Sequence, residues 1–240
     1  MNNPYKTSFL LLLLLFALVL AMNLSFGSVN IPLKAIVDIL FSNNSTHENW
    51  EIIITEFRIP KAITAIFSGS ALAVSGLLMQ TLFRNPLADP YILGISSGAS
   101  LGIAILILLV SLAGFSTLLL SNWSFVIAAA MGAFTIMMVV LTMASKIKNT
   151  MSILIIGLMF GSFASAIISI MAYFSSANQL QQYIAWSFGN LGNHATSELW
   201  VYFGFYTLCI IPLLFLIKPL NSLLLGENYA QSLGVHIIKV

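Results

Sequence analysis

Apolar residues occur in long runs along this chain, and short segments between the runs carry most of the charges. Stretches without Asp, Glu, Lys or Arg cover residues 7–33, 62–83, 90–145, 149–197 and 199–217. A transmembrane helix needs about 20 mostly apolar residues to cross a hydrocarbon core of about 30 Å. The pattern therefore predicts an all-α bundle with six membrane spans, at about 8–26, 62–83, 91–112, 123–145, 151–174 and 198–217.

Composition supports a membrane protein and excludes the soluble classes. Hydrophobic residues make up 59% of the chain and charged residues 7%, whereas a soluble domain is about 25% charged. The net charge of +2 indicates no nucleic-acid partner. A single cysteine, Cys209, excludes a disulfide framework and a multi-cysteine metal site. We predict one transmembrane domain over residues 1–240, lying in a lipid bilayer, with no metal and no cofactor.

The first apolar run has two interpretations. Lys6 followed by a leucine run could begin a cleaved signal peptide. The run from Ser8 to Phe26 is longer than a usual signal core, and no clean A-x-A site follows it. An uncleaved helix is therefore favoured.

Basic residues predict the orientation of the helices. With the N-terminus inside, six of them fall in cytoplasmic segments, namely Lys6, Arg84, Lys146, Lys148, Lys218 and Lys239. Three fall outside, namely Lys34, Arg58 and Lys61. Because cytoplasmic loops carry an excess of Lys and Arg, we expect a cytoplasmic N-terminus.

The predicted spans contain no Asp, Glu, Lys, Arg or His. Machines driven by protons or voltage place ionisable groups there, so the absence weighs against proton-coupled transport, while sodium coupling stays open. The chain also has no G-x-x-x-x-G-K-[ST] phosphate loop. We therefore expect no enzyme activity, and any ATP hydrolysis must come from another chain.

Glycines repeat every four residues in two predicted spans. Gly94, Gly98 and Gly102 line one face of the third span, and Gly157 and Gly161 do so in the fifth. Small residues at this spacing let helix backbones approach closely in lipid. We predict helix packing as their role.

Two segments depart from the pattern of spans. Residues 84–90 read R-N-P-L-A-D-P, and two prolines four residues apart cannot continue a regular helix. This 84–90 turn is either an ordinary tight turn or a constriction at the inner mouth of a pathway. Residues 221–235 are too polar to cross a membrane and favour short amphipathic helices broken near Gly226 and Gly234. Such an element lies on lipid or docks in a groove of a partner, and the scarcity of basic residues favours docking.

Several motifs together resemble the FecCD-type permeases of iron–siderophore, haem and cobalamin ABC importers. They are R-I-P-K at 58–61, S-G-S-A-L-A-V-S-G at 68–76, R-N-P-L-A-D-P at 84–90, L-G-I-S-S-G-A at 93–99 and L-G-E at 225–227. The resemblance implies a permease of the bacterial inner membrane that forms a homodimer or paired dimer. Two separate ATPase chains would dock beneath it, and an extracytoplasmic substrate-binding protein would deliver the ligand.

The resemblance also implies residue roles. Short helices at about 219–236, the C-terminal segment, would couple to the ATPases through Leu223, Leu224, Gly226, Glu227, Tyr229, Ala230, Leu233 and Gly234. Asn85, Leu87 and Thr150 match positions that narrow the cytoplasmic end of the pathway. Arg58 and Lys61 would pair with carboxylates of the binding protein or, alternatively, anchor a helix end at the membrane surface. Lys61 stands where the family has arginine and lacks its bidentate fork.

The length differs from the resemblance, because the family has about ten spans. We expect the chain to be a truncated or partial permease that does not transport alone. Two other functions remain as alternatives, a secondary transporter or channel and a non-transporting membrane scaffold.

Overall fold

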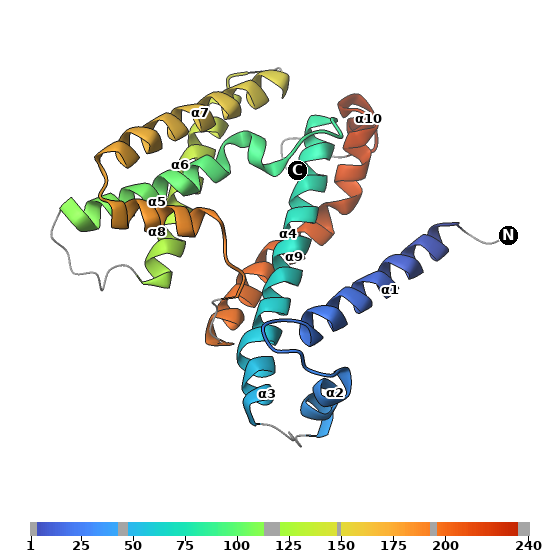
Figure 1. Ribbon diagram of the computed structural model, residues 1–240. Coiled ribbons are helices and arrows are strands. Elements are labelled where there is room, and N and C mark those ends of the chain that lie inside the picture. Colours follow the sequence, from blue (N-terminus) through green and yellow to red (C-terminus); the bar gives the residue numbers. More distant parts are fainter. Residues whose placement is uncertain (1–3, 43–47, 113–120, 148–149, 193–195, 235–240) are drawn as a thin grey trace. The chain divides into compact units, whose positions relative to one another are not determined.

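The computed structural model describes residues 4–42, 48–112, 121–147, 150–192 and 196–234, and every regular element in them is helical. The all-α prediction is therefore confirmed. The elements are α1 (Pro4–Ser25), α2 (Leu33–Ser42), α3 (Glu48–Ile52), a π-helix (Ile53–Arg58), α4 (Ile59–Phe83), a 3-10 helix (Pro90–Leu93), α5 (Ile95–Leu112), α6 (Asn122–Ala144), α7 (Thr150–Phe174), α8 (Ala177–Ser187), α9 (Thr196–Leu224) and α10 (Glu227–Ser232) (Figure 1).

The chain forms two compact units. The first comprises Met1–Ala71 and Asn190–Leu214, and the second comprises Leu72–Gly189 and Phe215–Val240. Two of the three boundaries fall inside helices, within α4 and within α9, and the third lies between α8 and α9. The single transmembrane domain stays a prediction.

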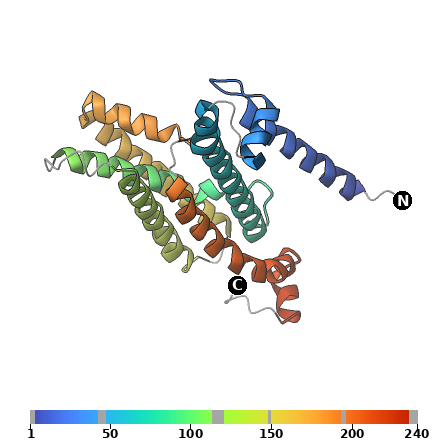
Figure 2. The same cartoon turned by 90° about the horizontal axis from the view of Figure 1, so that it is seen from below.

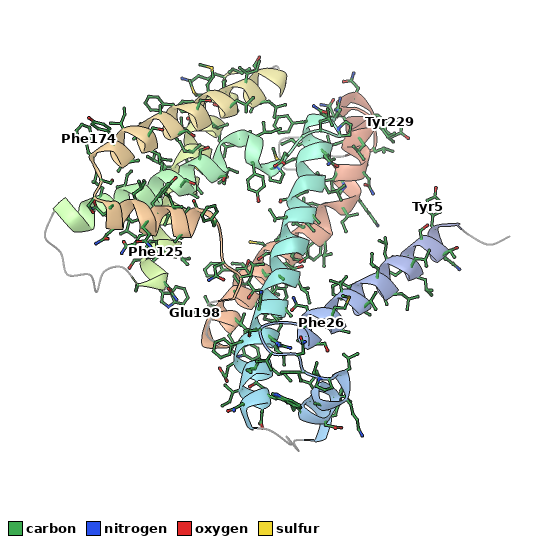
Figure 3. The ribbon with its side chains drawn as sticks, in the orientation of Figure 1. Tyr5, Phe26, Phe125, Phe174, Glu198 and Tyr229 are labelled. Carbon is green, nitrogen blue, oxygen red and sulfur yellow. The ribbon has the colours of Figure 1, made fainter. Side chains whose placement is uncertain are left out.

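The first unit has a small core beneath the end of α1. Four buried isoleucines form it, namely Ile31, Ile36, Ile39 and Ile54. Helix α1 itself is apolar all round, and its side chains from Tyr5 to Ser25 are mostly exposed (Figure 3). A helix that is apolar on every face suits lipid.

The second unit is a bundle centred on α5. This helix packs against α6, α7 and α8, and the four lie together in both views (Figures 1 and 2). Ile103, Ile107, Ile136, Val140 and Ala164 are buried among them. The bundle holds the 84–90 turn and most of the candidate residues.

Five helices in the described residues are long and apolar enough to cross a membrane, against the six spans predicted. They cover Tyr5–Ser25, Asn49–Phe83, Asn122–Ala144, Ser152–Phe174 and Glu198–Leu224. The stretch predicted as a span at 91–112 is divided, because Gly94 adopts a left-handed conformation (φ 75°) between the 3-10 helix and α5. Its apolar helix covers Ile95–Leu108 among the residues whose side chains are described.

Two helices extend beyond the predicted spans. The helix predicted at 62–83 begins at Asn49, and the charged residues of its first turns lie within it. The one predicted at 198–217 continues through Lys218 and Pro219 to Leu224. Charges at a helix end reach water with their long side chains and leave the backbone helical.

Candidate functional site

The 84–90 turn begins where α4 ends, and backbone hydrogen bonds cap the helix there. Arg84 has φ 46°, a left-handed conformation that is uncommon for a residue other than glycine. The Arg84 amide donates to the Thr81 carbonyl (3.3 Å) and the Asn85 amide donates to the Gln80 carbonyl (3.1 Å). This pair of bonds is a Schellman motif, which satisfies carbonyls that a helix end would otherwise leave unpaired.

Two side chains fix the rest of the turn. Asn85 Oδ1 accepts from the Leu87 amide (2.9 Å), and Asp89 Oδ1 accepts from the Tyr91 amide (2.7 Å). The Ala88 amide donates to the Asn85 carbonyl (3.0 Å). Asn and Asp side chains bond backbone amides two residues on, which stabilises a tight turn. The turn therefore has one specified shape.

The turn packs on the start of α7. Ala88, Phe83 and Leu154 form a buried cluster, and Leu154 lies four residues after the first residue of α7. The residues predicted to narrow the cytoplasmic end of the pathway thus lie on two segments in contact, the turn and the start of α7. Leu87 projects from the turn and is 83% exposed, and the half-buried Asn85 is bonded within the turn. The side chain of Thr150 lies outside the described residues, so its role stays a prediction.

Helices α5 and α6 approach each other at glycines. A Cβ atom added to Gly98 would lie 2.7 Å from the Gly132 carbonyl oxygen, and one added to Gly102 would meet the Ala128 carbonyl. Real Cβ atoms essentially never come within 3.0 Å of such atoms. Gly132 and Ala128 on α6 are absent from the sequence predictions, although their four-residue spacing is the small-residue signal already used for α5.

The other predicted glycines lie where α7 contacts the 3-10 helix and the start of α5. A Cβ added to Gly94 would lie 2.9 Å from the Gly157 carbonyl oxygen, and one added to Gly157 would lie 2.6 Å from the Ile92 carbonyl oxygen. Gly161 has more room, with Ser97 Oγ at 3.4 Å. The backbone just after the 84–90 turn is therefore held directly against α7.

The C-terminal segment consists of the end of α9 and the short α10. The Gly226 amide donates to the Leu223 carbonyl (3.1 Å) where α9 ends, and Gly226 has φ 115°. Gly234 has φ 82° after α10. The chain thus breaks at both glycines, but the first of the two expected short helices is the continuous end of α9. Residues 235–236 lie outside the described residues.

Apolar side chains of this segment are exposed. Leu224, Leu225, Tyr229 and Leu233 are exposed, and Tyr229 marks α10 in Figure 3. Ala230 is fully buried. Leu223 is half-buried, and the side chain of Glu227 is not among those described. These exposed apolar side chains lie at the end of α9 and on α10, next to the polar residues of the segment.

Arg58 and Lys61 differ in what surrounds them. Arg58 is 8% exposed, and its guanidinium donates to the carbonyls of Leu24, Ser25 (3.0 Å) and Val29. These carbonyls belong to the end of α1 and the following loop. Lys61 is exposed on α4. The carbonyl partners of Arg58 could not be predicted from the sequence, because every residue has a backbone carbonyl.

The described residues contain no group of three or more His, Cys, Asp or Glu that could hold a metal ion. The candidate residues are instead backbone amides, carbonyls, glycines and exposed apolar side chains. Such a set can pack helices, shape a constriction and bind a partner.

Known permease proteins are similar to this chain in sequence. The chain is 36% identical over 229 residues to the haemin transport system permease protein HmuU of Yersinia pestis. This match covers 94% of this chain and 67% of HmuU. It is 34% identical over 189 residues to the vitamin B12 import system permease protein BtuC of Escherichia coli O157:H7, covering 77% of this chain and 55% of that protein.

A solved structure has the same fold. It is a metal-chelate type ABC transporter in an inward-facing conformation, with a TM-score of 0.78 and 26% identity, covering 98% of this chain and 70% of that one. The chain thus spans about 55–70% of the length of the proteins it matches. The model of the FecCD transport family matches residues 12–240. The resemblance carried by the motifs is confirmed, and this multi-pass membrane protein belongs to the FecCD transport family.

Proposed function

We propose that the chain serves as the membrane-spanning permease subunit of an ATP-binding-cassette importer. The family match over residues 12–240 is the observation that carries this proposal. The chain has no phosphate loop of its own, so two separate ATPase subunits would supply the energy. The assembly would hold two permease subunits in the bacterial inner membrane, with the N-terminus of each in the cytoplasm.

The transported ligand would be a metal chelate. Relatives named for haemin transport and for vitamin B12 import support this class, and iron–siderophore complexes belong to it as well. The helices that could cross the membrane contain no Asp, Glu, Lys, Arg or His between Ala62 and Phe83, in α6 or in α7. A ligand would therefore meet mostly apolar and hydroxyl groups along them, and a delivering binding protein would supply selectivity.

The C-terminal segment would dock on the ATPases. Exposed Leu224, Leu225, Tyr229 and Leu233 offer the apolar anchors that a short helix presents to a groove. Helix α9 has 29 residues, about 44 Å at 1.5 Å per residue, and ends in this segment. Because a helix transmits displacement along its axis, movement of an ATPase would reach the membrane through α9.

The 84–90 turn would form the cytoplasmic constriction. Its backbone is held by bonds and by contacts with α7, so Leu87 is presented at a defined place. Thr150 begins the helix that the turn packs on. A displacement of α7 would carry the turn and open or close the constriction.

The proposal predicts that distorting Gly226 uncouples the ATPase. We expect Gly226→Val to lose ATPase subunits on co-purification, because φ 115° strains any side chain and the C-terminal segment would be misdirected. Gly189→Val is the matched control, since Gly189 also has positive φ (74°) and open space around it. ATPase retained equally by both variants would contradict the docking proposal.

Binding-protein docking would rest on Lys61 more than on Arg58. Lys61 is exposed, whereas the Arg58 guanidinium bonds three carbonyls of its own chain. We expect Lys61→Glu to weaken association with the binding protein by about threefold to tenfold, as for charges at the rim of an interface. Surface plasmon resonance would measure it, with Lys146→Glu as the control. An unchanged affinity for Lys61→Glu would refute the contact.

A further inference from the structure

A cleft of about 260 Å³ lies in the second unit between α5, α7 and α8. Hydroxyl groups line it, from Ser96, Ser97, Ser100, Ser165, Ser169 and Tyr183. Its one apolar lining residue is Ile168, and no Asp, Glu, Lys or Arg contributes to it. The cleft is therefore polar but uncharged.

The hydroxyls of the two helices differ in their bonding. On α7, Ser165 Oγ donates to the Gly161 carbonyl (2.9 Å) and Ser169 Oγ donates to the Ser165 carbonyl (3.0 Å). On α5, the hydroxyls of Ser96, Ser97 and Ser100 have no partner within the described part of the chain. Hydrocarbon cannot supply hydrogen bonds, so the α5 hydroxyls need water or a polar ligand.

A second, smaller cavity adjoins the cleft. It measures about 20 Å³ and is lined in part by Gln179, Ser175 and Tyr183, with Tyr183 and Ile168 shared between the two. A cavity holds one water when it offers roughly 10–15 Å³ to a water-sized sphere and two or more polar partners. The smaller cavity meets both conditions.

The side-chain amide of Gln179 also indicates a bound water in the smaller cavity. Its Nε2 is buried without a partner in the described residues. Its Oε1 accepts from the Ser176 amide (2.7 Å) in the capping box that starts α8. Exchanging Oε1 and Nε2 would set two donors against each other, so the cap fixes the orientation. Nε2 is thus a buried donor that needs an acceptor.

We infer that the cleft is an aqueous site on the flank of the bundle, open at the exposed Ser96, Ser165 and Ser169, and that it ends in a single bound water at Gln179. Water both donates and accepts, as the free hydroxyls of α5 require, and it supplies the acceptor for Nε2. The lack of charge on the walls favours a neutral ligand over an ion. The site would be hydrated whether or not the chain imports a chelate, so this inference and the ATPase proposal can fail separately.

Cysteine labelling of the full chain in lipid vesicles tests the inference. In a Cys209→Ser background, Ser169→Cys places a thiol in the cleft, and Ile170→Cys places one at the same depth on an exposed apolar side of α7. Only the thiolate reacts, and it forms in water. We expect a small methanethiosulfonate reagent to label position 169 roughly tenfold faster than position 170.

Filling the cleft provides a second measurement on a folded protein. Ser100→Ile adds apolar volume to the opposite wall, and we expect it to slow the labelling of Ser169→Cys severalfold without changing that of Ile170→Cys. Size-exclusion chromatography would show that each variant is folded. Equal rates at positions 169 and 170, or a rate at 169 that Ser100→Ile leaves unchanged, would overturn the aqueous site.

Discussion

The 84–90 turn and the C-terminal segment both interrupt the apolar pattern, yet they use their residues differently. The turn bonds its polar side chains to its own backbone, with Asn85 and Asp89 accepting from nearby amides, and Ala88 is buried against Phe83. Residues 224–233 bond to one another and to the last turn of α9, as from the Leu225 amide to the Ser222 carbonyl, and leave large apolar side chains exposed. The first segment is specified by its own chain, and the second has a surface that a partner can use. Substitutions should therefore affect stability in one and association in the other.

The largest effect on stability is expected at the glycine contacts between α5 and α6. We expect Gly98→Leu to destabilise the protein by about 3 kcal/mol or more, because even a Cβ would lie 2.7 Å from the Gly132 carbonyl oxygen. Thermal unfolding in detergent would measure the loss. Gly69→Leu is the control, since nothing lies within 4 Å of its added Cβ. A Gly98→Leu protein as stable as the control would show that α5 and α6 do not pack closely.

A smaller effect is expected within the turn itself. Asn85→Ala removes the acceptor of the Leu87 amide and should destabilise the protein by about 1 kcal/mol. Leu87→Ala is the matched control and should change stability by less than about 0.5 kcal/mol, because that side chain is exposed. The same unfolding assay applies. Equal losses from both variants would mean that the side-chain bond does not hold the turn.

The smallest effect on stability is expected in the C-terminal segment. Tyr229→Ser with Leu233→Ser should change the free energy of unfolding by less than about 1 kcal/mol in total, because both side chains are exposed. A loss comparable to that of Gly98→Leu would remove the distinction between the two regions.

Much of the fold follows from the apolar runs, because a membrane helix leaves a long and specific pattern. The exceptions have local causes. Gly94 divides the stretch predicted as one span at 91–112, and a helix continues past Lys218 and Pro219, where a change to polar residues had predicted its end. Composition within a window does not reveal a single left-handed glycine or a proline that a helix accommodates.

Less of the candidate site could be predicted from residues alone. The breaks at Gly226 and Gly234 and the glycine faces of α5 and α7 follow from residue type and spacing. The burial of Arg58 does not, because its partners are carbonyls of the end of α1 and the following loop, some 30 residues away in the sequence. The cleft is also hidden in the sequence, since its serines lie on helices that only the fold brings together.

On the proposed function, residues 224–233 bind an ATPase rather than stabilise the chain. The most direct measurement is the amount of ATPase that co-purifies with Tyr229→Ser and Leu233→Ser together, set beside the unfolding temperature of the same sample. Asn228→Ser with Gln231→Ser, on exposed polar positions of α10, is the matched control. We predict at least a tenfold loss of ATPase, about 1.4 kcal/mol in affinity, from the first pair only, with unfolding temperatures equal. ATPase retained in full by the Tyr229 and Leu233 double variant would contradict the account.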